Sequence, residues 1–143
     1  MTDQSWVRYG VERLRQVGLR PTQQRVALAE LLFAEGDRHI TAECLYDEAV
    51  AKNVKVSLAT VYNTLNQFRE AGLLREVVVR SGKSYFDTNT TAHHHAFDER
   101  TGRVEDIDLG VDEDELRRLV EVPSGKCITG VDVVVRVRDE ERA

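Results

Sequence analysis

The residues in this sequence whose types and spacing most clearly suggest a chemical role are three consecutive histidines, His93, His94 and His95. A short histidine cluster is a metal-binding signal, because imidazole nitrogen is a common ligand of transition metals. We expect a β-strand from about residue 93 to residue 98. Side chains alternate along a strand, so His93 and His95 face one side of the sheet and His94 the other.

Two carboxylates are expected to lie beside these imidazoles. Pairing across a turn at residues 99–102 places Asp106 opposite His95 and Asp108 opposite His93. Cross-strand neighbours have Cβ atoms roughly 5 Å apart, so the imidazoles and one or two carboxylates converge on one sheet face. Nitrogen and oxygen ligands without a thiolate suit divalent iron, manganese, zinc or cobalt. The alternative interpretation is a solvated histidine run on an edge strand.

A second group of polar residues lies on a predicted helix in which Val61, Leu65 and Phe68 form the buried stripe. Asparagine and glutamine can bind adenine edges in the major groove of DNA, and alanine or threonine methyl groups can contact thymine. An ordinary solvated helix face is the alternative. The residues off the buried stripe are Ser57, Ala59, Thr60, Tyr62, Asn63, Asn66 and Gln67.

The elements around this helix form the pattern of a winged helix-turn-helix. Four helices are expected to begin near Ser5, after Thr22, after Thr41 and after Ser57. Two strands follow, at residues 74–80 and 84–87, joined by a turn at residues 81–83. Arg80 and Lys83 stand at the tip of this hairpin, and their positive charge favours DNA binding.

The fold class expected from this order is α+β. Residues 1–87 form a winged-helix DNA-binding domain, residues 88–92 a polar linker, and residues 93–143 a small α/β domain. Because residues 93–143 are too few to form a large hydrophobic core by themselves, we expect this domain to dimerise.

The elements of the small domain are a hairpin, a helix and a long strand. The helix is capped by Asp112, and a strand runs from Cys127 to about Arg138. The helix is expected to bury Leu116, Leu119 and Val120. Cys44 and Cys127 are expected to be small core residues rather than ligands.

Composition and charge exclude several classes of protein. The chain has 143 residues, 41% hydrophobic and 31% charged, and its apolar runs are far shorter than the roughly 20 residues of a membrane span. Met1 to Trp6 lacks the features of a signal peptide, and two distant cysteines suit a reducing cytoplasm. The net charge of −5 conceals an asymmetry, because residues 1–86 carry +2 and residues 87–143 carry −7.

A small metal hydrolase is the alternative from another class, but neither a nucleophile motif nor a glycine-rich phosphate loop is present, so no enzyme is expected.

Three segments together resemble the ferric uptake regulator family. They are GLRPTQQR at residues 18–25, HITAECLY at residues 39–46 and SLATVYNTL at residues 57–65. The resemblance implies a dimeric, metal-sensing winged-helix repressor that binds double-stranded DNA at an AT-rich inverted repeat. It assigns Arg20 to the minor groove and Tyr62 to base contact, and it adds Arg25 to the DNA-binding residues.

The same resemblance implies a regulatory metal site between the two domains, with iron, manganese or zinc as the divalent ion. Metal binding there would fix the angle between the DNA-binding helices of the dimer. The residues at the family's ligand positions are His39, Asp87, His93, His95 and Asp106.

Residues 98–101 read DERT, where most members of the family carry Cys-x-x-Cys for a structural zinc. The missing cysteines and the triple histidine resemble the iron response regulator branch, which senses haem. This implies that His93, His94 and His95 ligate haem and that the repressor is iron-responsive, although neither cysteine precedes a proline as in that branch's second haem motif. The alternative is a peroxide or manganese sensor of the same family, because the peroxide branch also has aspartate at the position of Asp87.

Overall fold

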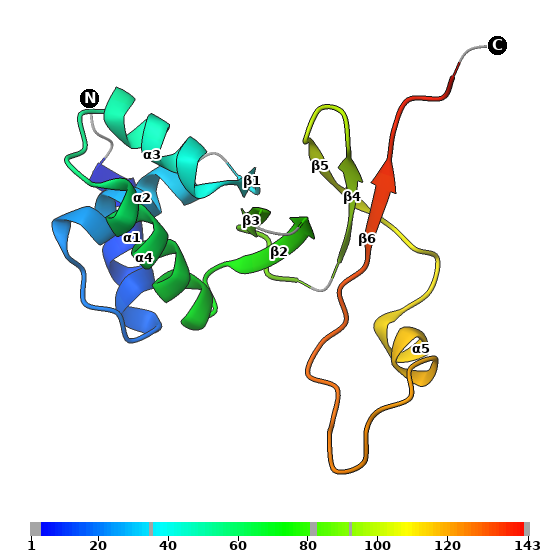
Figure 1. Ribbon diagram of the computed structural model, residues 1–143. Coiled ribbons are helices and arrows are strands. Elements are labelled where there is room, and N and C mark those ends of the chain that lie inside the picture. The colour runs from blue at the N-terminus through cyan, green and yellow to red at the C-terminus, as the bar shows by residue number, and fades with distance from the viewer. Residues whose placement is uncertain (1–3, 35, 81–82, 92, 142–143) are drawn as a thin grey trace. The chain divides into compact units, whose positions relative to one another are not determined.

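The computed structural model describes residues 4–34, 36–80, 83–91 and 93–141 of the chain (Figure 1). The chain divides into two compact units between Thr90 and Thr91, a point inside the predicted linker. Each unit combines helix with a three-stranded sheet, which confirms the predicted α+β fold.

The first unit contains four helices, which begin where the sequence predicts. They are α1 (Gln4–Gln16), α2 (Gln23–Phe33), α3 (Ala42–Ala51) and α4 (Leu58–Glu70). Thr22, Thr41 and Ser57 are the N-caps of α2, α3 and α4, and each side-chain oxygen accepts a backbone N–H from the first turn. Gly72 follows α4 with φ of +85°, a conformation that glycine adopts without the steric cost of a side chain.

The sheet of the first unit has one strand more than predicted. The expected hairpin is present as β2 (Arg75–Arg80) and β3 (Lys83–Asp87). A two-residue strand, β1 (His39–Ile40), pairs antiparallel with β3, and the sheet order is β1-β3-β2. The predicted turn at residues 81–83 falls largely outside the described residues, as do the side chains of Arg80 and Lys83.

The core of the first unit lies between its helices and the sheet. Val61, Leu65 and Phe68 are fully buried on α4, which confirms the predicted stripe. Leucines from α1, α2 and α3 and Phe86 from β3 complete the cluster. The N-terminal, solvent-facing side of α4 therefore has a rigid support.

The second unit has the sheet order β5-β4-β6. Its elements are β4 (His94–Asp98), β5 (Val104–Ile107), α5 (Glu113–Arg118) and β6 (Val134–Val137). The antiparallel pairing of β4 with β5 places His95 opposite Asp106, so the predicted register is confirmed. β6 pairs parallel with the other edge of β4.

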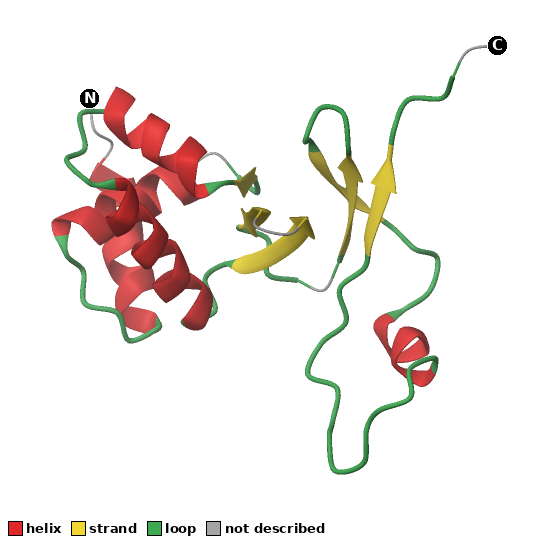
Figure 2. Cartoon of the chain, in the orientation of Figure 1, coloured by secondary structure: helices red, strands yellow, loops and turns green. Residues whose placement is uncertain are grey.

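The predicted long strand from Cys127 to Arg138 is wrong in its extent. Within the described chain, regular strand forms there only over β6, and a long loop connects α5 to it (Figure 2). The parallel register places His95 of β4 opposite Val134 of β6, and β4 begins one residue earlier, at His94. The residues that precede Val133 therefore have no residue of β4 opposite them.

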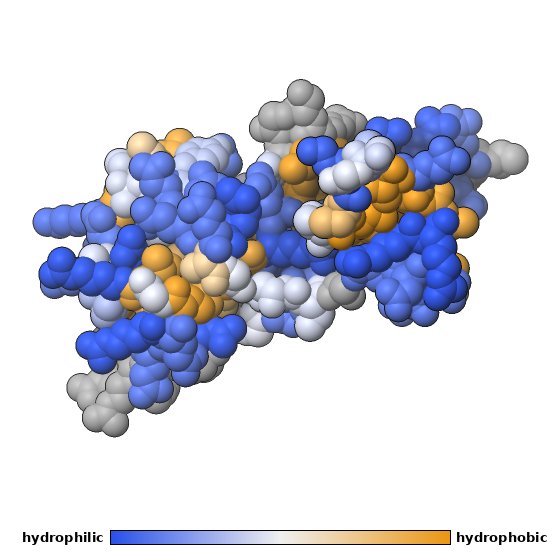
Figure 3. All heavy atoms as spheres, turned by 90° about the horizontal axis from the view of Figure 1, so that it is seen from below, coloured by the Kyte–Doolittle hydropathy of each residue, from blue (hydrophilic) through white to orange (hydrophobic). Residues whose placement is uncertain are grey.

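The small domain buries little apolar surface. Phe97 and Val104 are buried in its sheet, whereas Leu119 and Val120 are 80% and 51% exposed. The prediction that these last two residues pack inward is wrong, because α5 ends at Arg118, one residue earlier. Apolar side chains gather on one face of this unit (Figure 3, right).

Both cysteines are exposed, so the prediction that they fill the core is wrong. Cys44 stands in the first turn of α3, and Cys127 lies in the loop before β6. None of the helices in the described residues is long and apolar enough to cross a membrane.

Candidate metal-binding and DNA-binding sites

The first unit contains two of the predicted metal ligands, His39 and Asp87. The pairing of β1 with β3 places them directly opposite each other, and His39 Nε2 lies 3.0 Å from Asp87 Oδ2. Asp87 is only 1% exposed, and its other oxygen, Oδ1, accepts the backbone N–H of Asn89 at 2.9 Å. A carboxylate so deeply buried requires a compensating positive charge, which a protonated histidine or a metal ion supplies.

A set of hydrogen bonds beside this pair holds its two segments together. The backbone N–H of Arg38 donates to Thr88 Oγ1 at 2.8 Å, and the backbone N–H of Thr88 donates to the Arg38 carbonyl at 3.1 Å. The Arg38 guanidinium also donates to both carboxylate oxygens of Glu48, at 2.8 and 2.9 Å. Arg38 precedes His39 and Thr88 follows Asp87, so these bonds hold the two backbone segments that carry the predicted ligands. Sequence analysis missed Arg38 and Thr88.

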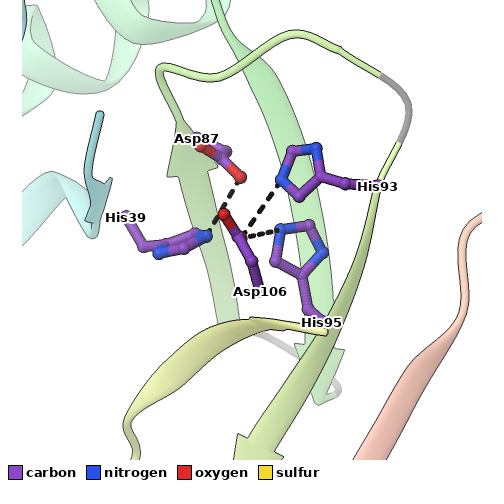
Figure 4. Close-up of side chains that lie close together, drawn as sticks. All are labelled: His39, Asp87, His93, His95 and Asp106. Atoms are coloured by element: carbon purple, nitrogen blue, oxygen red, sulfur yellow. Dashed lines mark ion pairs between the residues drawn. The ribbon is translucent and has the colours of Figure 1, made fainter. Parts of the chain in front are cut away.

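The second unit contains the other three predicted ligands, His93, His95 and Asp106. One carboxylate oxygen, Asp106 Oδ1, lies 3.2 Å from His93 Nε2 and 3.4 Å from His95 Nε2. The two imidazole rings are 4.5 Å apart between centroids, and His95 is 3% exposed. Figure 4 draws the side chains of both sets, with the ion pairs inside each unit dashed. Asp108 follows the last residue of β5, and the His93 ring contacts Asp106 instead.

Hydrogen bonds to Nδ1 distinguish His93 from its neighbour His94. His93 Nδ1 lies 2.5 Å from the Thr91 carbonyl, which can only accept, so in the neutral ring Nδ1 carries the proton and Nε2 presents its lone pair. His94 Nδ1 instead accepts the backbone N–H of Val133 at 3.2 Å. In the neutral ring this leaves the proton on Nε2, so that nitrogen offers no lone pair to a metal.

The predicted DNA-binding residues of α4 cluster at its N-terminal end. Ala59, Tyr62 and Asn63 are exposed there. The hydroxyl groups of Ser57 and Thr60 lie 2.9 Å apart, and Ser57 Oγ also accepts the backbone N–H of Thr60. These two residues therefore cap the helix in addition to any contact with DNA.

The hydroxyl group of Tyr62 has a partner that sequence analysis missed. It donates a hydrogen bond to Glu43 in the first turn of α3. This bond, together with partial desolvation and the nearby negative charge of Glu43, raises the pKa of Tyr62. With its proton committed to Glu43, the Tyr62 oxygen faces the solvent as a hydrogen-bond acceptor.

The predicted DNA-binding arginines differ in their surroundings. Arg20 is exposed in the turn between α1 and α2. Arg25, on α2, donates through Nε and Nη2 to Gln67 Oε1 on α4, at 3.3 and 3.0 Å. Its Nη1 donates to the Arg20 carbonyl at 3.0 Å. All three nitrogens of the Arg25 guanidinium therefore donate to acceptors of the protein itself.

Comparison with known proteins identifies the class. The model of the ferric uptake regulator family matches residues 16–125, and the chain belongs to this family. It is 40% identical over 106 residues to the peroxide operon regulator of Bacillus subtilis, covering 73% of this chain and 72% of that protein. It is 36% identical over 94 residues to the ferric uptake regulation protein of Bordetella parapertussis, covering 66% of this chain and 63% of that protein.

Solved structures agree with this assignment. The ferric uptake regulator of Pseudomonas aeruginosa with manganese is 29% identical, with a TM-score of 0.73 over 92% of this chain and 98% of that chain. The protein is thus a metal-responsive, DNA-binding transcriptional regulator of the ferric uptake regulator family and not an enzyme.

Proposed function

We propose that the protein is a repressor whose DNA binding depends on one divalent ion held by both ligand sets, namely His39 and Asp87 with His93, His95 and Asp106. The single observation that carries this proposal is the chemistry of the two sets. In each unit, imidazole Nε2 atoms face a carboxylate at ion-pair distance. Each set alone offers two or three ligands, which is fewer than the four to six that such ions take. Only five residues separate Asp87 of the first set from His93 of the second.

The ligand types allow manganese, iron or zinc in the sensing role, and the relatives favour the first two. The proposed set offers imidazole nitrogen and carboxylate oxygen and no thiolate, which suits Mn(II), Fe(II) and Zn(II). A peroxide-sensing or manganese-sensing repressor has the better support, since one relative is a peroxide operon regulator and a related structure holds manganese. The chemistry that Fe(II) supplies when bound is reduction of hydrogen peroxide. The imidazoles of His39 and His93 are the oxidisable groups that would be next to it.

Iron sensing through haem has less support. Haem iron requires an accessible imidazole lone pair. His95 is 3% exposed, and the lone pair of His94 Nδ1 accepts the Val133 N–H. His93 shares Asp106 with His95 in the second ligand set.

The proposed repressor acts as a homodimer on an AT-rich inverted repeat in the cytoplasm. The exposed apolar face of the second unit supports dimerisation, because the unit by itself has a small core. A dimer with twofold symmetry presents two α4 helices to two half-sites, so the operator repeats in inverted order.

Operator binding with and without metal tests the proposal. We expect the protein stripped with EDTA to bind a duplex selected from random DNA weakly, and the protein with Mn(II) to bind it tightly. Fluorescence anisotropy measures both affinities. Hydrogen peroxide added to the Fe(II) form, but not to the Mn(II) form, should release the duplex if the peroxide assignment holds. Equal affinity with EDTA and with Mn(II) would contradict metal dependence.

Replacement of Tyr62 by alanine should weaken operator binding by about 5- to 150-fold, the effect of removing a base interaction worth roughly 1–3 kcal/mol. The side chain is 40% exposed, so the melting temperature should stay close to that of the wild type. Tyr62→Phe removes only the hydroxyl group and serves as the matched control. Unchanged affinity of Tyr62→Ala for the operator would contradict the assignment of this residue to the DNA interface.

A further inference from the structure

Arg25 joins two segments that carry different parts of the proposed DNA interface. One is the turn between α1 and α2, where Arg20 is exposed, and the other is α4. Arg25 Nη1 donates to the Arg20 carbonyl, and Nε and Nη2 donate to Gln67 Oε1, with all three distances between 3.0 and 3.3 Å. The side chain therefore bridges the backbone of Arg20 to the recognition helix.

These bonds occupy the groups that the two side chains would otherwise offer to DNA. Three of the five N–H donors of the guanidinium point to protein acceptors, and both bonds to Gln67 are partly buried. Gln67 accepts two donors on its single amide oxygen, and recognition of adenine requires that same oxygen together with the amide nitrogen. The arrangement suits a structural link better than an interaction with phosphate or base.

The backbone near Arg20 makes this link effective. The Arg20 carbonyl also accepts the backbone N–H of Thr22 at 3.0 Å, and Thr22 Oγ1 caps α2 by accepting the backbone N–H of Arg25. The turn, the start of α2 and the Arg25 side chain thus form a closed hydrogen-bonded set. Without the guanidinium, this set loses its connection through Gln67 to α4.

We propose that Arg25 and Gln67 are positioning residues that set the location of Arg20 relative to the recognition helix α4. Operator binding then requires the minor-groove contact of Arg20 and the major-groove contacts of α4 at a fixed spacing. This inference rests on the proposed function, because it concerns the proposed DNA interface. It assigns Arg25 an indirect role in place of the direct DNA contact predicted from the sequence.

The test measures operator affinity and its salt dependence for the Mn(II)-loaded full chain. The single variants are Arg25→Ala, Gln67→Met and Arg20→Ala. Two double variants combine Arg20→Ala with Arg25→Ala and with Gln67→Met. Gln67→Met keeps the side-chain length but removes the acceptor, and Gln16→Met, at the exposed end of α1, is its control. Gln67→Glu keeps an acceptor for Arg25 and should restore a large part of the affinity that Gln67→Met removes.

We expect Arg25→Ala and Gln67→Met to lower affinity by similar factors and to have little further effect when Arg20 is already alanine. Gln67→Met removes no charge, yet it should make the salt dependence of binding shallower, as Arg20→Ala does. The negative slope of log affinity against log salt should decrease in magnitude by about 0.9 for each phosphate that the protein no longer neutralises. A wholly structural role would instead give additive reductions in affinity.

The outcomes separate the inference from the proposed function. If Arg25→Ala lowers the salt slope and Gln67→Met leaves it unchanged, Arg25 contacts phosphate directly and the inference is overturned. Additive reductions with Arg20→Ala, or full affinity in Gln67→Met, overturn it as well, while operator binding by the wild type still supports the proposed function. A wild-type protein that selects no operator overturns both.

Discussion

Replacement of His95 by alanine is expected to abolish metal-dependent operator binding. His95 is 3% exposed, and its Nε2 shares Asp106 Oδ1 with His93, so the substitution removes a buried member of the proposed ligand set. Loss of a partner that only orients a ligand typically costs 10- to 100-fold in metal affinity, so we expect a direct ligand to cost at least about 100-fold. Titration of the metal-free protein with Mn(II) measures the affinity, and anisotropy measures DNA binding.

His94→Ala is the matched control for this experiment. It removes an adjacent imidazole whose Nδ1 accepts the Val133 N–H instead of facing Asp106. We expect this variant to bind Mn(II) and operator as the wild type does. Circular dichroism checks that both variants are folded. Wild-type Mn(II) affinity in His95→Ala, or a reduction in His94→Ala as large as in His95→Ala, would contradict the proposed ligand set.

Leu119→Asp is expected to convert the dimer into a monomer. The side chain is 80% exposed, next to Val120 at 51%, on a unit with few buried apolar residues. A charge buried without a partner in a dimer interface is strongly unfavourable. Since the two DNA-binding units of a dimer bind one operator together, separation should lower the affinity by about 10²- to 10⁴-fold. Sedimentation velocity measures the oligomeric state.

The control for the dimer experiment is Val50→Asp, which places the same charge on an exposed aliphatic residue of the first unit. This variant should sediment as the wild type does. If Leu119→Asp remains a dimer at the same protein concentration, Leu119 is not part of the dimer interface.

The features that follow from local sequence were predictable. The N-caps Thr22, Thr41 and Ser57 bond to amides three residues ahead, so a short sequence window contains the whole interaction. The hairpin of β4 and β5 is local in the same sense, because the position of its turn sets His95 opposite Asp106.

Features that depend on distant residues were not predictable in this way. The two residues of β1 are too few to show the alternation that indicates a strand, and their pairing partner is in β3, more than 40 residues away. The bonds between Arg38 and Thr88, and between Tyr62 and Glu43, join residues 50 and 19 positions apart. The proton positions on His93 and His94 depend on which backbone group each ring meets.

The bonds between Arg38 and Thr88 also shorten the tether between the two ligand sets. Because Thr88 is tied to the first unit, the connection between the two ligand sets is shorter than the five residues that separate Asp87 from His93. Short tethers give effective concentrations in the millimolar range, so an ion bound to one set meets the other as an intramolecular partner. The proposed site would then act as a chelator, which keeps the ion as long as either set still holds it. Insertion of glycines after Thr88 should therefore speed metal dissociation although every ligand is retained.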